Sequence, residues 1–66
     1  MSINVNSTTQ AWVQNETVKT LLIRMNYVFP LVVVKIDGEV IPKSQYATIE
    51  IPDGSTVEVI HLISGG

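Results

Sequence analysis

The chain contains no cysteine among its 66 residues, and this absence excludes several kinds of chemistry. Without cysteine there is no disulfide, no thiolate metal ligand and no cysteine nucleophile. Any sulfur that the protein handles must therefore be attached to a group other than a side-chain thiol. Histidine is also scarce. The single one, His61, has no carboxylate at a metal-ligand spacing, so we expect a structural role for it near the end of a strand.

Charged residues are few and do not cluster. They make up 15% of the chain, and its four basic residues are scattered along it: Lys19, Arg24, Lys35 and Lys43. Such scattered residues do not form a basic stripe that could bind a phosphate backbone, so nucleic acid is not an expected partner. The six carboxylates fall mainly at predicted turns and solvated strand positions, with no pair placed for acid–base catalysis. We therefore expect no enzyme active site, no metal site and no cofactor bound by the chain itself.

The sequence also lacks a long hydrophobic run. Its longest apolar region, residues 18–36, is interrupted by charged residues and Pro30, which argues against a membrane span. The first six residues lack the charged and apolar regions of a signal peptide. With 45% hydrophobic residues and a formal net charge of -2, the composition is typical of one small folded domain. We expect it to be cytoplasmic, and monomeric when free.

The first half of the chain predicts a hairpin followed by a helix. Residues 2–6 alternate polar and apolar, which indicates a half-buried strand, and residues 10–13 are its expected return after a turn at 7–9. Thr17 is a good N-cap for a helix over 18–25, which Pro30 keeps from continuing. The apolar residues of this helix that recur at helical spacing, and so should be buried, are Val18, Leu21, Leu22 and Met25. Trp12 is expected in the core or at its edge.

The second half predicts short strands separated by turns. The expected strands are 31–36, 39–41, 48–51 and 56–63, and the expected turns are 37–38, 42–46 (or a single helical turn) and 52–55. The last strand is apolar on both faces, which is typical of a strand in the middle of a sheet or one with a binding face. One helix packed across a mixed sheet of four to five strands, with the final strand central, is an α+β fold of the β-grasp (ubiquitin-like) type. A ferredoxin-like fold would need a second full helix, and the sequence predicts none.

We therefore expect a β-grasp domain over residues 1–63 and a flexible tail over residues 64–66 that ends in Gly65 and Gly66. Two glycines at a chain end leave a thin tail that can enter a narrow channel, although small residues are also simply tolerated at termini. The reactive group that remains is the carboxylate of Gly66. A partner holding ATP and magnesium can convert it to an acyl adenylate, and a sulfur nucleophile can then produce a thiocarboxylate.

Three stretches resemble the ThiS family, the ubiquitin-like sulfur carriers of thiamine (thiazole) biosynthesis within the wider MoaD/ThiS group. Residues 36–46, IDGEVIPKSQY, are similar to its "vNgeivPrsqw" segment, and residues 17–22, TVKTLL, to its "tTvaeLL" helix start. Asp53-Gly54 and the final Gly65-Gly66 are similar to its "dGdeveivtavaGG" end. Lys43 and Tyr46 stand where arginine and tryptophan are usual. The related MoaD carriers of molybdopterin synthesis are typically longer and often have prolines before their terminal glycines, which residues 61–64 lack.

The resemblance implies a function and partners. Gly66 would be adenylated by a ThiF-like adenylyltransferase, receive sulfur ultimately from a cysteine desulfurase, and donate it to the thiazole synthase ThiG. Ser64 and Gly65 would supply reach, and Ile60, Leu62 and Val33 would form a partner-docking surface on the sheet face away from the helix. ATP and magnesium would belong to the activating partner. The alternatives are a MoaD-like carrier, a ubiquitin-like modifier joined to targets through Gly66, and a plain binding module.

Overall fold

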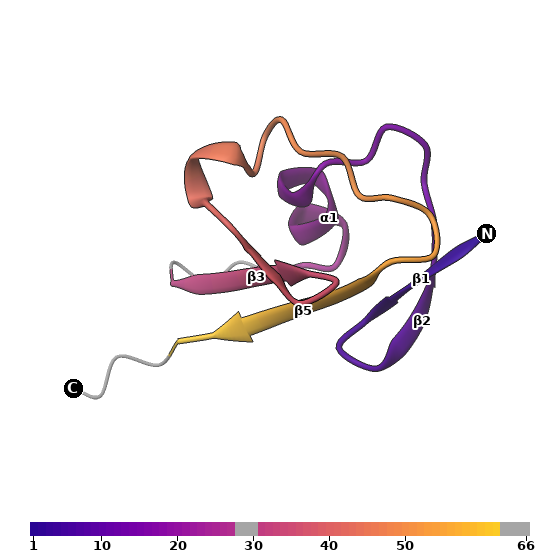
Figure 1. Ribbon diagram of the computed structural model, residues 1–66, viewed down its shortest axis with the longest axis horizontal. Helices are drawn as coiled ribbons and strands as arrows, with labels where there is room; N and C mark the ends of the chain where they lie inside the picture. Colours follow the sequence, from indigo (N-terminus) through magenta and orange to yellow (C-terminus); the bar gives the residue numbers. More distant parts are fainter. Residues whose placement is uncertain (28–30, 63–66) are drawn as a thin grey trace.

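A computed structural model of the chain describes residues 1–27 and 31–62. In this part of the chain five strands form one mixed sheet, and an α-helix packs across one of its faces (Figure 1). The elements are β1 (Ser2–Val5), β2 (Thr8–Ala11), α1 (Val18–Arg24), β3 (Val32–Ile36), β4 (Glu39–Ile41), the 3-10 helix η1 (Lys43–Gln45) and β5 (Thr56–His61). The predicted mixed sheet with one main helix is confirmed.

The last strand lies in the middle of the sheet, as its two apolar faces predicted. The strand order is β2-β1-β5-β3-β4. Strand β5 runs parallel to β1, with Val57 opposite Val5, and antiparallel to β3, with pairs from Val32–His61 to Ile36–Val57. In this central position, one face of β5 is buried beneath α1 at Val57 and Val59.

Helix α1 begins with a reciprocal cap. The Thr17 hydroxyl accepts a hydrogen bond from the Thr20 backbone N–H at 3.3 Å, and the Thr17 N–H donates to the Thr20 hydroxyl at 2.8 Å. These bonds satisfy donors that the first turn of a helix leaves free, so Thr17 acts as the predicted N-cap. The helix ends at Arg24, and Met25 is its C-cap. Pro30, the predicted helix breaker, lies outside the described residues.

The core lies between α1 and the sheet. Of the four residues expected on the buried side of the helix, Val18 and Leu21 are fully buried, while Leu22 and Met25 are half-buried and pack against the core. The buried apolar side chains that they join are Ile3, Val5, Val34, Ile36, Ile41, Tyr46, Ile51, Val57 and Val59. Trp12 is at the core edge, as expected, and its indole N–H donates to the Ile51 carbonyl at 2.8 Å.

Glu16 and Arg24 tie the start and end of α1 to strand β2. The Arg24 Nε and Nη2 atoms donate to the two Glu16 carboxylate oxygens at 2.8 and 2.9 Å, and Nη2 also donates to the Ala11 carbonyl at 3.1 Å. The hydrogen bond to Glu16 raises the pKa of Arg24, so its guanidinium stays charged. Glu16 is buried, and this bidentate pair satisfies its carboxylate.

Two predicted elements differ from the structure. The turn expected at 7–9 is a two-residue turn at Asn6 and Ser7, with φ of 50° and 68°, so β2 begins at Thr8 and ends before Trp12. Two consecutive positive φ values suit the twist of a tight hairpin, and asparagine tolerates them well. The strand expected at 48–51 is reduced to a single bridge between Thr17 and Glu50, because its backbone bonds to the residues that begin α1 and not to the sheet.

The other predicted turns are confirmed. Asp37 and Gly38 form the β3–β4 turn with φ of 51° and 84°, and residues 43–45 form a single helical turn. Gly54 has a φ of 80° in the turn before β5, which glycine adopts without strain.

Candidate functional site

The candidate site lies where β5 ends, because this strand leads directly into the residues that the sequence assigns to the tail. In Figure 1, β5 runs from the side of the sheet where the amino terminus lies to the opposite side. Strand β1 pairs with its first half at Asn4–Thr56 and Val5–Val57, and β3 pairs with it as far as His61. The start of β5 therefore has a strand on each side.

The Asn6 side chain extends this support past the end of β1. Its Nδ2 donates to the Val59 carbonyl at 3.1 Å, and its Oδ1 accepts from the Val59 N–H at 2.8 Å. The Asn6 backbone N–H also donates to the Val57 carbonyl at 3.0 Å. One amide side chain thus replaces a further strand residue and holds β5 in place up to Val59.

Apolar side chains gather on the sheet face opposite α1, at the end of β5. Val33 on β3 lies directly across from Ile60 on β5, and the Leu62 N–H donates to the Leu31 carbonyl at 3.0 Å. Ile60, Leu62 and Leu31 are 38%, 46% and 49% exposed. We call these four residues, Leu31, Val33, Ile60 and Leu62, the apolar strip.

A cross-strand pair of charges borders the apolar strip on the side toward the start of β5. Lys35 on β3 lies opposite Glu58 on β5, and Val40 on the edge strand β4 lies opposite Lys35. Val40 is 56% exposed. An exposed apolar area with a polar border is typical of a protein contact site.

The structure thus brings together the three residues predicted for docking, Ile60, Leu62 and Val33. It adds Leu31 to the strip, which the sequence analysis did not include, and it places the exposed Val40 beyond the Lys35–Glu58 border. Alternation along residues 31–36 places Leu31 on the same face as Val33, but the sheet register is needed to place Leu31 beside Leu62. The remaining predicted site residues, Ser64, Gly65 and Gly66, lie outside the described residues, as does Ile63.

No alternative chemical centre emerges from residues 1–27 and 31–62. Within them no three side chains of the metal-ligating types lie close enough to hold an ion. His61 is exposed at the end of β5, where it lies opposite Val32. In the same ranges no helix has the length and apolar character needed to cross a membrane.

Two comparisons with known proteins identify the same family. The model of the ThiS family matches residues 3–66 of this chain. The crystal structure of the thiamine biosynthesis protein ThiS from Geobacter metallireducens superposes with a TM-score of 0.81 at 26% sequence identity, and the match covers 100% of both chains. Comparison with curated protein sequences gives no match.

Proposed function

This chain belongs to the ThiS family of sulfur carriers for thiamine biosynthesis, which are not enzymes, and we propose that Gly66 is the residue that carries the sulfur. The observation behind this proposal is that the family match extends through residue 66 and so includes Gly65 and Gly66. Residues 1–63 would then be the β-grasp domain, and residues 64–66 the tail that enters the active site of a partner enzyme.

The proposed chemistry takes place on the terminal carboxylate. A carboxylate is a poor acyl donor, because oxide or hydroxide would have to leave. In the active site of a ThiF-like adenylyltransferase, a Gly66 oxygen attacks the α-phosphorus of magnesium-bound ATP, pyrophosphate leaves, and an acyl adenylate forms. Hydrosulfide then attacks the carbonyl carbon, the new C–S bond replaces the C–O bond to AMP, and a thiocarboxylate results. If a persulfide attacks instead, the acyl disulfide that forms must be cleaved by a thiol, which ends as a disulfide.

Ser64 and Gly65 would give the tail its reach. Each residue of an extended chain adds at most about 3.3–3.6 Å, so these two residues would let the Gly66 carboxylate reach beyond the end of the sheet when the tail is extended. Glycine at position 65 also leaves bare backbone, which fits a channel too narrow for a side chain.

The apolar strip is the proposed docking surface for the activating enzyme and, after sulfur transfer, for the thiazole synthase ThiG. Ile60 and Leu62 lie at the end of the strand that leads into the tail and are substantially exposed, with Val33 and Leu31 beside them. A partner that covers the strip would remove this apolar area from water and would at the same time hold the tail near its active site. The sulfur would come ultimately from a cysteine desulfurase, and the use of ATP is consistent with a cytoplasmic location.

The test is ATP–pyrophosphate exchange with a cognate ThiF-like enzyme. Deleting Gly66 moves the carboxylate back by about one residue length, 3.3–3.6 Å, which is too far for attack on a phosphorus that must be met within about 3–3.5 Å. We expect no exchange from this deletion or from Gly65→Val, while circular dichroism remains unchanged. Full exchange by the Gly66 deletion would rule out the tail chemistry.

Intact-mass analysis of the protein from its native host separates a carrier from a ubiquitin-like modifier. A carrier gains the mass difference between one sulfur and one oxygen atom, whereas a modifier is found joined to other proteins. Sulfur transfer to ThiG, compared with transfer to molybdopterin synthase, identifies the receiving pathway and distinguishes this chain from a MoaD-like carrier.

A further inference from the structure

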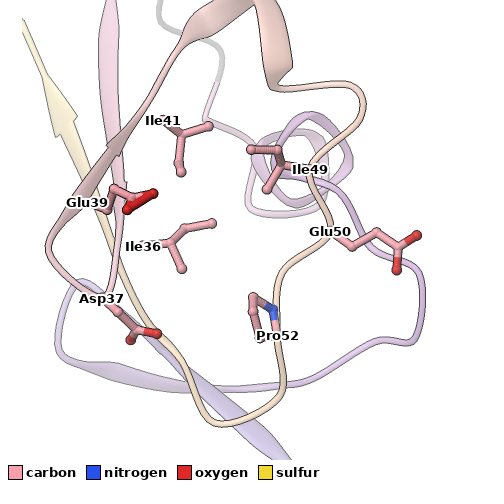
Figure 2. A pocket seen from close by; sticks show the side chains of 7 residues that line it. All are labelled: Ile36, Asp37, Glu39, Ile41, Ile49, Glu50 and Pro52. Atoms are coloured by element: carbon pink, nitrogen blue, oxygen red, sulfur yellow. The ribbon is translucent and has the colours of Figure 1, made fainter.

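A second candidate site lies on the helix side of the sheet, away from the apolar strip. A pocket of about 340 Å³ opens between the β3–β4 hairpin and the loop that follows η1 (Figure 2). Its lining residues are Ile36, Asp37, Glu39, Ile41, Ile49, Glu50 and Pro52. Ile36 pairs with Val57 near the start of β5, whereas the strip lies at the other end of that strand, so the two sites are separate.

Both walls of the pocket are held by hydrogen bonds to neighbouring elements. On the hairpin side, the Asp37 N–H donates to the Thr56 carbonyl and the Asp37 carboxylate accepts from the Thr56 N–H, both at 2.8 Å. On the loop side, the Ile49 carbonyl accepts from the Val18 N–H at 3.2 Å, at the start of α1. The pocket is therefore preformed, and its volume is at the lower end of the range for ligand sites.

The lining combines an apolar surface with negative charge. Figure 2 shows Ile36, Ile41, Ile49 and Pro52 around the hollow, with Glu39 on the hairpin side and Glu50 on the opposite side, where its carboxylate extends outward. No lysine or arginine lines the pocket. Across residues 1–27 and 31–62 the one salt bridge is Arg24–Glu16, so among these residues no ion pair neutralises Glu39 or Glu50.

We propose that this pocket binds an arginine side chain carried by an apolar segment of a partner protein. An arginine has an apolar stem that can lie along the isoleucines, and its weakly hydrated guanidinium can reach the carboxylates at the rim. An acidic segment would be repelled, and a purely apolar segment would gain no charge attraction from the two exposed glutamates. A protein bound here leaves the apolar strip uncovered, so this surface can act together with the strip or independently of it.

The first experiment is an NMR titration of the full 15N-labelled chain with the peptide acetyl-Leu-Arg-Leu-amide. The matched probe is acetyl-Leu-Gln-Leu-amide, which keeps the apolar flanks and removes the charge. We expect saturable amide shifts at Asp37, Glu39, Ile49 and Glu50 with the arginine peptide, with a dissociation constant in the millimolar range or tighter, and clearly weaker binding of the glutamine peptide. No saturable shift up to about 10 mM, or equal affinity for the two peptides, would overturn the proposal.

The second experiment removes the charges at the pocket. The double variant Glu39→Gln with Glu50→Gln should bind the arginine peptide more weakly by about 1.5- to 5-fold for each carboxylate, the range for exposed ion pairs. The matched control is Glu58→Gln, an exposed carboxylate on the opposite face of the sheet, which should leave the affinity unchanged. Equal loss in the control, or shifts centred on Val33 and Ile60, would mean general charge attraction or binding at the apolar strip, and either result overturns the proposal.

Discussion

The two faces of strand β5 have similar aliphatic residues, but helix α1 covers one face and leaves the other open to water. Val57 and Val59 are 0% and 9% exposed beneath α1, whereas Ile60 is 38% exposed on the other face. Apolar area lowers the free energy only when it is removed from water. The valines therefore stabilise the folded domain itself, and Ile60 can contribute that free energy only when a partner covers it. The face on which an aliphatic residue lies, more than its type, sets its role.

The largest expected effect on stability comes from a substitution in helix α1, which covers the buried face of β5. Leu21 of α1 is 0% exposed, and Leu21→Ala should lower the free energy of unfolding by about 2–5 kcal/mol. That is a large share of the roughly 5–15 kcal/mol that stabilises a typical protein. The measurement is urea denaturation followed by circular dichroism. The control, Ile23→Ala, changes a residue of the same helix that is 67% exposed, and it should cost no more than about 0.5 kcal/mol.

A valine-to-threonine substitution should have a smaller effect on stability, and its size should differ between the two faces of the sheet. Val57→Thr keeps the shape of the side chain but buries a hydroxyl, which should cost about 1–3 kcal/mol because that group loses its water. Val33→Thr makes the same change on the open face, where water remains available, and should cost no more than about 0.5 kcal/mol. Equal denaturation midpoints for the two variants would contradict the contrast between the faces.

The smallest effect on stability is expected at the apolar strip. Ile60→Glu should lower the free energy of unfolding by no more than about 1 kcal/mol, the span of strand propensities, because its side chain is already partly in water. In ATP–pyrophosphate exchange it should raise the KM for the carrier at least about tenfold, or about 1.4 kcal/mol, since a charge would be buried without a partner.

The maximal exchange rate of this variant should be kept, because its tail is intact. Thr9→Glu is the matched control: Thr9 pairs with Asn4 on the same open face but lies on the edge strand β2, outside the strip. Its KM should stay at the wild-type value. An unchanged KM for Ile60→Glu would remove the strip from the docking model.

Much of the fold could be predicted because it depends on short-range patterns. The Thr17 cap needs only a hydroxyl and a neighbouring free N–H, and the Asp37-Gly38 turn needs only residues that tolerate positive φ. The two wrong predictions had different causes. Asn6 and Ser7 were read as the end of one strand and the start of a turn, although together they form the turn. Residues 48–51 alternate like a strand, but their backbone partners come from the start of α1.

In the candidate site, too, local patterns predicted some residues and the folded structure was needed for others. Alternation in the last strand separates Ile60 and Leu62 from the buried valines, which is why these two residues could be predicted for docking. Leu31 could not be added, because its place beside Leu62 depends on the pairing of segments distant in sequence. The pocket beside Glu39 and Glu50 could not be predicted either. One of its walls is held by hydrogen bonds to β5 and the other by hydrogen bonds to the start of α1, and both contacts require the folded chain.

Residue order alone was enough to exclude cysteine chemistry and to predict the start of the helix, the turns at 37–38 and 52–55 and the alternation of the last strand, because each depends on composition or on neighbours within a few positions. The strand order, the support of β5 by Asn6 and the meeting of Val33 with Ile60 required the folded chain. Asn6 and Val59 are 53 positions apart, and such contacts exist only when the whole sheet assembles and buries its core. Non-local pairing, which no short segment encodes, thus decides which surfaces this protein offers to its partners.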